Sequence, residues 1–191
     1  MMLNLLLWAC DAPIKDDTSN IGSTVQQIEE SPIYWEESEC SYNGGDHICN
    51  LSLPTADGDF DYLYSHYGEV IVVDLSAMWC GPCQEAAWNS NSVSVIADGV
   101  TWITVLIENL DGDPPTQEDG EVWGDYFGIW HDEIMLGSND NRDADGLTGF
   151  ANTGWPYFLI LDKDLRIRTV QSGWNKEDII TNIEILKQND E

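Results

Sequence analysis

Basic residues are scarce in this sequence. Its 191 residues include 7 Lys and Arg against 35 Asp and Glu, which gives a formal net charge of -28. A chain this negative repels the phosphate backbone of nucleic acids and the anionic surface of a membrane. The composition therefore excludes a nucleic-acid-binding function.

Long apolar runs and histidines are also scarce. No stretch reaches the roughly 18 consecutive apolar residues that a membrane-spanning helix needs. The 3 histidines, His47, His66 and His131, lack the paired spacing of zinc ligands. We therefore expect no metal site and no bound cofactor. What is present, 42% hydrophobic residues with 9 tryptophans, suffices for one folded domain.

The acidic residues are unevenly distributed. Residues 11–61 contain 12 acids and 1 base, and residues 111–145 contain 11 acids with Arg142 as their 1 base. Of the 7 bases, 5 follow Asp162. This pattern is typical of a solvated acidic surface joined to an acidic tether. A site for cations or for a basic partner is the alternative.

The 5 cysteines divide into two pairs and a single residue. Cys80 and Cys83 form a Cys-x-x-Cys motif. Cys40 and Cys49 are close enough in sequence for a structural disulfide across a short loop, and two unpaired thiols are the alternative. Cys10 is then left alone.

The N-terminal residues 1–10 resemble a bacterial lipoprotein signal, with Leu7, Ala9 and Cys10 at the matching positions. The apolar stretch is short and no Lys or Arg precedes it, so an ordinary N-terminus with a stray cysteine is the alternative. The resemblance implies lipidation of Cys10, a flexible acidic tether over residues 11–39, and a location on the periplasmic side of the cell envelope. Such an oxidising compartment suits a structural disulfide.

Strand and helix patterns alternate along the rest of the chain. Thr116 and Asp119 form a capping-box pattern that predicts a helix over residues 116–129, and Asn175 caps a last helix. Residues 84–88 read as a helix that we expect to be short or bent, because the following Asn-Ser-Asn-Ser is poor helix material. The remaining patterns predict strands at residues 48–53, 70–75, 100–107, 157–161 and 165–170. The sequence thus predicts an α/β fold with a central sheet flanked by helices.

The main chemical signal is a Cys-x-x-Cys motif that follows a predicted strand and opens a predicted helix. A helix N-terminus favours the thiolate of a cysteine placed there, which is Cys80. Pro82 suits the first helical turn, and Cys83 lies one turn further on. This spacing predicts disulfide exchange in which Cys80 attacks and Cys83 resolves the mixed disulfide. A buried disulfide or half of a zinc site is the alternative.

Residues 79–83, Trp-Cys-Gly-Pro-Cys, are identical to the active-site motif of thioredoxins, and the segment leading into them is similar to theirs. The resemblance implies a thioredoxin-like fold with a mixed β-sheet. Asp74 matches the buried aspartate of that family, which implies that it accepts the proton of Cys83. A carboxylate that merely satisfies local amides is the alternative. Peroxiredoxins are less similar, because Ala77 stands where they have threonine.

A wider resemblance, over residues 40–191, is to the extracytoplasmic TlpA/ResA-type oxidoreductases. It is carried by residues 51–58, 153–160 and 162–167, and it implies an inserted strand and helix over residues 108–129. It also implies a cis Pro156 beside Cys80 that exposes the backbone of Trp155 to a substrate peptide; a trans proline is the alternative. The substrate groove would then be formed by Trp79, Gly81, Pro82, Trp155 and Pro156.

Three positions depart from that pattern. Trp155 is larger than the residue usual there, Ala86 stands where ResA-like proteins often have glutamate, and Leu165 stands where the family hairpin usually has glycine. Residues 139–146 resemble a calcium loop, but the first Asp and the bidentate Glu are lacking, so a solvated acidic loop is favoured.

These observations predict a monomeric thiol–disulfide oxidoreductase. It would exchange disulfides with extracytoplasmic proteins, receive its electrons from a redox partner protein, and contact the membrane only through an anchor at Cys10. A binding module that uses the dithiol to handle metals or to sense redox state is the alternative.

Overall fold

The structure, a computed structural model, describes residues 35–36, 39–96 and 99–188, which belong to one compact unit over residues 31–191. The predicted signal segment with Cys10, and most of the predicted tether, lie outside the described residues. Within the described part, no helix has the length and apolar character needed to cross a bilayer.

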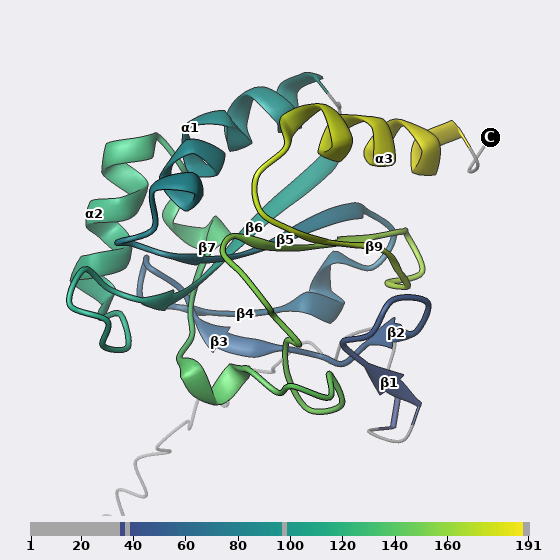
Figure 1. Ribbon diagram of the computed structural model, residues 1–191, viewed down its shortest axis with the longest axis horizontal. Coiled ribbons are helices and arrows are strands. Elements are labelled where there is room, and N and C mark those ends of the chain that lie inside the picture. The colour runs from purple at the N-terminus through teal and green to yellow at the C-terminus, as the bar shows by residue number, and fades with distance from the viewer. Residues whose placement is uncertain (1–34, 37–38, 97–98, 189–191) are drawn as a thin grey trace, which may run out of the picture. The chain divides into compact units, whose positions relative to one another are not determined.

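A five-stranded sheet with the order β7-β6-β5-β8-β9 forms the centre of this unit (Figure 1). β5, β6 and β7 are parallel to one another, and β8 is antiparallel to both of its neighbours, β5 and β9. All 8 residues of β5 are buried, which suits its β-branched sequence because both sheet faces are covered. The strands are β5 (Val70–Ala77), β6 (Val100–Glu108), β7 (Ile134–Leu136), β8 (Tyr157–Leu161) and β9 (Ile167–Ser172). The predicted mixed sheet is confirmed.

Different elements cover the two faces of the sheet. The helices α1 (Gly81–Ile96) and α3 (Lys176–Gln188) pack on the face that carries Val70 and Val72 (Figure 1). The opposite face, with Ile71 and Val73, packs against the N-terminal elements. These are β1 (Cys40–Ser41), β2 (His47–Ile48), β3 (Ser52–Pro54), β4 (Phe60–Tyr62) and the short 3-10 helix η1 (Leu63–His66). The alternation along β5 follows from the pleat of a strand.

The predicted helix caps are present. In α2 (Gln117–Phe127) the Thr116 side chain accepts a hydrogen bond from the Asp119 backbone, and the Asp119 carboxylate accepts one from the Thr116 backbone. Such a cap contributes about 1 kcal/mol to stability. α3 begins directly after Asn175, whose side-chain oxygen accepts from the backbone N–H of Asp178.

Of the two alternatives expected for the first helix, short or bent, the first is wrong, because α1 continues over 16 residues. The side chains of Asn89, Ser90 and Ser92 donate to carbonyl oxygens of their own helix, so they do not compete with it. Lys176 Nζ of α3 also donates to the side chains of Asn89 and Ser92, each at 3.0 Å. A contact between two helices therefore overrides the weak local propensity.

Smaller differences concern loops and strand ends. The strand expected at residues 48–53 is divided into β2 and β3, and the inserted strand, β7, follows the predicted insertion instead of lying within it. Two 3-10 helices, η2 (His131–Glu133) and η3 (Asn139–Asn141), flank β7. Leu165 has a φ of 57°, the left-handed region that favours the glycine usual at this turn. Trp35, within the predicted tether, stacks on His47 with ring centroids 4.3 Å apart.

Candidate active site

Cys80 and Cys83 lie at the N-terminal end of α1, directly after the buried strand β5. A disulfide joins them, with 5.2 Å between their Cα atoms. The backbone N–H of Cys83 donates to Cys80 Sγ at 3.2 Å. Cys83 is fully buried and Cys80 is 4% exposed, whereas Gly81 and Pro82 are exposed at the first turn. Unpaired amides at a helix start favour negative charge on a sulfur atom, so this position suits a reactive thiolate.

Asp74 is fully buried in β5. It has the same pleat parity as Val70 and Val72, which pack with Ala86 of α1, so its side chain faces the helix that carries both cysteines. Its Oδ1 accepts a hydrogen bond from Ser76 Oγ at 2.8 Å, and its Oδ2 has no partner with hydrogen-bonding geometry among the described residues.

Burial raises the pKa of Asp74 to about 7, against smaller opposing effects from Ser76 and Trp102. The indole N–H of Trp102 approaches the carboxylate closely enough to act on this pKa without reaching hydrogen-bonding geometry. A carboxyl group with a pKa near neutrality can take up and release a proton under physiological conditions.

Two tryptophans form the rim of the dithiol. Trp79 is 46% exposed, and its ring meets the Trp155 ring edge-on, with centroids 6.2 Å apart. Trp155 packs against the hydrophobic cluster that contains Cys80 and Cys83. The Trp155–Pro156 peptide bond is cis. Residues from β5, α1 and the segment before β8 are therefore gathered around one disulfide.

Three further residues join these tryptophans, and sequence reasoning assigned none of them to the site. Glu108, at the end of β6, accepts hydrogen bonds from Trp79 Nε1 at 2.7 Å and from Asn139 Nδ2 at 3.0 Å. Arg142 donates to Asn139 Oδ1 at 2.8 Å, and its guanidinium lies 5.3 Å from the centre of the Trp155 ring. These five residues form a closed chain of contacts, which we call the rim network. The one sequence signal for it was the isolation of Arg142 as a base.

The second cysteine pair lies elsewhere in the fold. Cys40, in β1, and Cys49, directly after β2, are joined by a disulfide with 4.9 Å between their Cα atoms. Cys49 packs against the core cluster on the sheet face opposite α1. This bond connects the N-terminal elements to one another and lies at no helix N-terminus.

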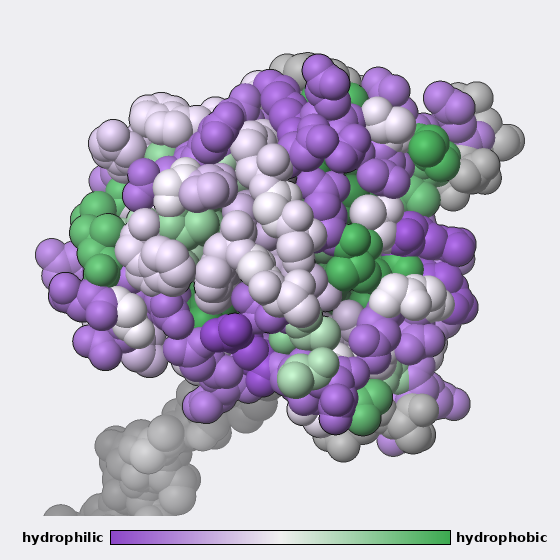
Figure 2. Space-filling view, in the orientation of Figure 1, coloured by the Kyte–Doolittle hydropathy of each residue, from purple (hydrophilic) through white to green (hydrophobic). Residues whose placement is uncertain are grey.

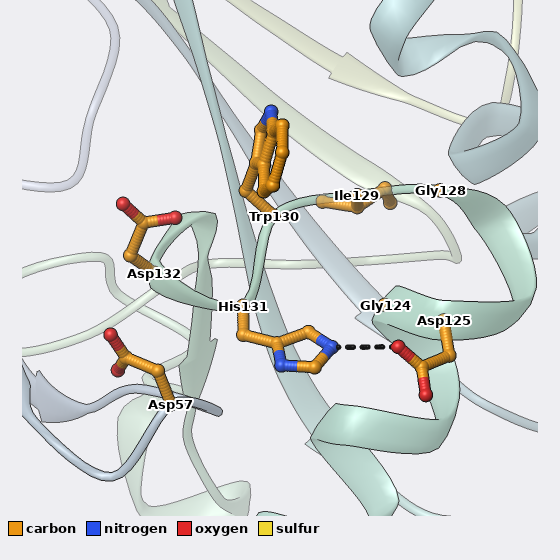
Figure 3. Close-up of a pocket in the computed structure, with 8 residues that line it drawn as sticks. All are labelled: Asp57, Gly124, Asp125, Gly128, Ile129, Trp130, His131 and Asp132. Carbon is orange, nitrogen blue, oxygen red and sulfur yellow. Dashed lines mark hydrogen bonds and ion pairs between the residues drawn. The ribbon is translucent and has the colours of Figure 1, made fainter.

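A cavity of about 540 Å³ lies beside the C-terminal end of α2, and neither Cys80 nor Cys83 lines it. Figure 3 shows His131 turned toward Asp125, with Nε2 and Oδ1 3.2 Å apart, and Asp57 and Asp132 on its other side. A Cβ atom on Gly124 would lie 2.5 Å from the His131 ring, so this packing requires glycine.

No described group of three or more His, Cys, Asp or Glu side chains is arranged to hold a metal ion. In the loop that resembles a calcium site, both oxygens of Asp143 accept hydrogen bonds from the loop itself. The donors are the backbone N–H groups of Asp145, Leu147 and Thr148 and the Thr148 hydroxyl. This loop is thus organised by its own backbone.

Hydrophilic side chains dominate the face of the molecule seen in Figure 2, and hydrophobic ones gather there only in small groups. This distribution accords with the large excess of acidic residues. Because basic side chains are so few, any single cation near the dithiol is one of few positive charges on the protein.

Comparisons with known proteins identify the fold. No model of a protein family matches the chain, and no curated protein matches its sequence. The thioredoxin domain of a thiol-disulfide oxidoreductase from Bacteroides vulgatus is similar in structure, with a TM-score of 0.61 and 16% identity over 76% of this chain and 98% of that one.

Two further structures are similar. A thiol:disulfide interchange protein of the thioredoxin family from Chlorobium tepidum TLS has a TM-score of 0.56 and 20% identity, over 72% of this chain and 92% of that one. The exposed lipoprotein thioredoxin of Streptococcus pneumoniae has a TM-score of 0.52 and 16% identity, over 72% of this chain and 100% of that one. The architecture of the described residues is therefore the thioredoxin-like fold.

Proposed function

We propose that this protein is a thiol–disulfide oxidoreductase whose redox-active group is the Cys80–Cys83 pair. Because one fold hosts many functions, the proposal rests on the site itself. The observation that carries it is a disulfide across the first turn of α1, after a buried strand whose Asp74 carboxyl faces the same helix.

The proposed reaction is a two-step exchange. The Cys80 thiolate attacks one sulfur of a substrate disulfide, forms a mixed disulfide, and releases the other substrate sulfur as a thiolate. Cys83 then loses its proton and attacks Cys80 Sγ, which releases the second substrate thiolate. Two electrons pass to the substrate, whose thiolates take up two protons, and the Cys80–Cys83 disulfide is formed. The reverse sequence oxidises a substrate dithiol.

Asp74 is the proposed proton acceptor for Cys83. With its pKa raised to about 7 by burial, the carboxyl is neither permanently charged nor permanently protonated near neutral pH. This allows it to receive a proton during resolution and to return it in the reverse reaction. The role is that of a base on the face of β5 toward which α1 packs.

The substrate groove in this proposal comprises Trp79, Gly81, Pro82, Trp155 and Pro156. The exposure of Gly81 and Pro82 and the partial exposure of the two tryptophans support this assignment. A substrate peptide would pair with the backbone of Trp155 as an added strand, with its reactive sulfur at Cys80.

We further propose that the protein is a TlpA/ResA-type monomer of the extracytoplasmic cell envelope, anchored through Cys10 and the tether over residues 11–39. Its partners would be protein thiols and disulfides and a redox partner protein. The Cys40–Cys49 disulfide supports an oxidising compartment. The similar pneumococcal protein is named an exposed lipoprotein, which also supports this setting.

Trapping of the mixed disulfide tests the function. The Cys83→Ser variant, incubated reduced with a peptide disulfide, is expected to accumulate one peptide on Cys80, whereas wild type releases both peptide thiols. Intact mass and peptide mapping identify the linked cysteine. As a matched control, Cys49→Ser is expected to complete the exchange. No adduct on Cys80, together with no thiol release by wild type, would contradict the proposal and favour a binding module.

A further inference from the structure

Arg142 is the only Lys or Arg between residues 16 and 162, and the structure brings it to the rim of the dithiol. Its guanidinium lies over the ring of Trp155, the residue that precedes Pro156 and packs against the cluster containing Cys80. An acidic protein therefore has one isolated cation beside the backbone at which a substrate would bind.

The hydrogen bonds of Arg142 leave its positive charge without a carboxylate partner in the described part of the chain. Nε and Nη1 donate to the amide oxygens of Asn152 and Asn139, respectively, and both acceptors are neutral. Arg142 is exposed, and it forms no ion pair with any described residue. A guanidinium has five N–H donors in a planar fork, and Nη2 of Arg142 donates to no residue in the described part of the chain.

The two carboxylates closest to Arg142 along the rim network and the loop are occupied by other donors. Glu108 accepts from Trp79 and Asn139, one at each oxygen. Among the residues that the structure describes, Asp143 accepts only from its own loop. Neither of these two carboxylates therefore pairs with Arg142, although the chain has 35 acidic residues.

We propose that Arg142 is a specificity-determining residue that receives a carboxylate flanking the reactive sulfur of a substrate. The inference rests on the proposed oxidoreductase function and names its substrate class, namely thiols and disulfides with an acidic group beside the cysteine. The fork of an arginine matches the two oxygens of a carboxylate. Trp155 and the two asparagines hold the fork in place, so that binding needs little further ordering.

The carboxylate has two sources, an acidic side chain or a peptide C-terminus, and the test distinguishes them. Reduced protein reacts with three peptide disulfides: acetyl-cysteinyl-glutamine amide, acetyl-cysteinyl-glutamate amide, and acetyl-cysteinyl-glutamine with a free terminal carboxylate. Each reaction reduces one peptide disulfide to two thiols and oxidises the Cys80–Cys83 pair. The quantity measured at constant salt is the ratio of each acidic rate constant to the neutral one.

Four variants isolate the charge of Arg142. We expect Arg142→Gln to lower at least one acidic-to-neutral ratio about fivefold, which is the scale of a well-placed exposed ion pair. Asn152→Asp, which supplies the missing carboxylate next to an unchanged Arg142, is expected to lower the same ratio. Arg142→Lys, which keeps the charge and loses the fork, is expected to lower it less. Lys163→Gln removes one charge at the other end of β8 and serves as the control.

The acidic peptide whose ratio to the neutral peptide falls in Arg142→Gln identifies the source of the carboxylate. Ratios in Arg142→Gln and Asn152→Asp equal to those of Lys163→Gln would overturn the proposal and leave Arg142 a purely structural rim residue. The absence of any reaction of wild type with the neutral peptide would instead overturn the oxidoreductase function on which the inference rests.

Discussion

The two disulfides of this protein are the same bond in different surroundings. Cys80–Cys83 spans the first turn of α1, beside a buried carboxyl and an aromatic rim. Cys40–Cys49 joins β1 to the residue that follows β2, on the other side of the sheet. A thiolate released at a helix N-terminus is stabilised there, whereas one released at β1 or β2 gains no such stabilisation. Under the proposed function, position in the fold therefore makes Cys80–Cys83 the reactive disulfide and Cys40–Cys49 a structural one.

The largest expected effect separates the two pairs by activity. We predict that Cys80→Ser lowers the rate of disulfide exchange by at least about a thousandfold, because the attacking atom itself is removed. Measurement of thiol release from a peptide disulfide, with quenching by alkylation, gives the rate. Cys40→Ser is the matched control and is expected to keep most of the wild-type rate. Equal losses in both variants would end the distinction between the two disulfides.

Much of this site could be predicted from the sequence, because its parts are local. The motif over residues 79–83 follows a β-branched strand and opens a helix, and Thr116 and Asp119 are three residues apart. The rim network could not be predicted in this way. Glu108 and Asn139 lie 29 and 31 residues from their partners Trp79 and Glu108, and only the tertiary fold brings them together. The length of α1 escaped prediction for the same reason, since Lys176 of α3 supports it.

Asp74 gives the second prediction, which concerns stability as a function of pH. Since burial raises its pKa from 3.8 to about 7, the folded protein keeps a proton that the unfolded chain has lost between these pH values. The free energy of unfolding therefore falls as pH rises from about 4 to about 7, by about 4 kcal/mol. Asp74→Asn is expected to remove this fall and to slow resolution by Cys83.

Denaturant unfolding at several pH values, together with the decay of the mixed disulfide, tests this prediction. Glu85→Gln, on the exposed side of α1, is the control for loss of one carboxylate. An Asp74→Asn protein whose stability fell with pH as steeply as that of wild type would show that another group is responsible.

Removal of the second disulfide gives the third prediction. Cys40→Ala combined with Cys49→Ala is expected to lower the free energy of unfolding by about 2–3 kcal/mol, as a short disulfide loop does. Exchange by the folded protein is expected to stay at the wild-type rate. Urea unfolding and the peptide-disulfide assay are the two measurements. If the double variant lost disulfide exchange while its free energy of unfolding stayed unchanged, Cys40 and Cys49 would have a catalytic role.

The smallest expected effect concerns the rim network. Glu108→Gln replaces one acceptor oxygen with an amide that donates, so either Trp79 or Asn139 loses its hydrogen bond. Because this contact is exposed, we expect a loss of about 0.5 kcal/mol in stability and about a twofold change in exchange rate. The fluorescence of the protein and its urea unfolding curve report these changes. Glu184→Gln on α3 is the control. Equal changes in both variants would contradict a contribution of Glu108 through the rim network.

Redox titration of both pairs in one sample tests the account most directly. The protein carrying Cys10→Ser is equilibrated in glutathione buffers of graded potential, free thiols are alkylated, and peptide mapping reports each cysteine pair. We predict a reversible two-electron couple at Cys80–Cys83 between about -270 and -120 mV, while Cys40–Cys49 remains oxidised throughout that range. A missing couple at Cys80–Cys83, or reduction of Cys40–Cys49 at the higher potential, would contradict the account.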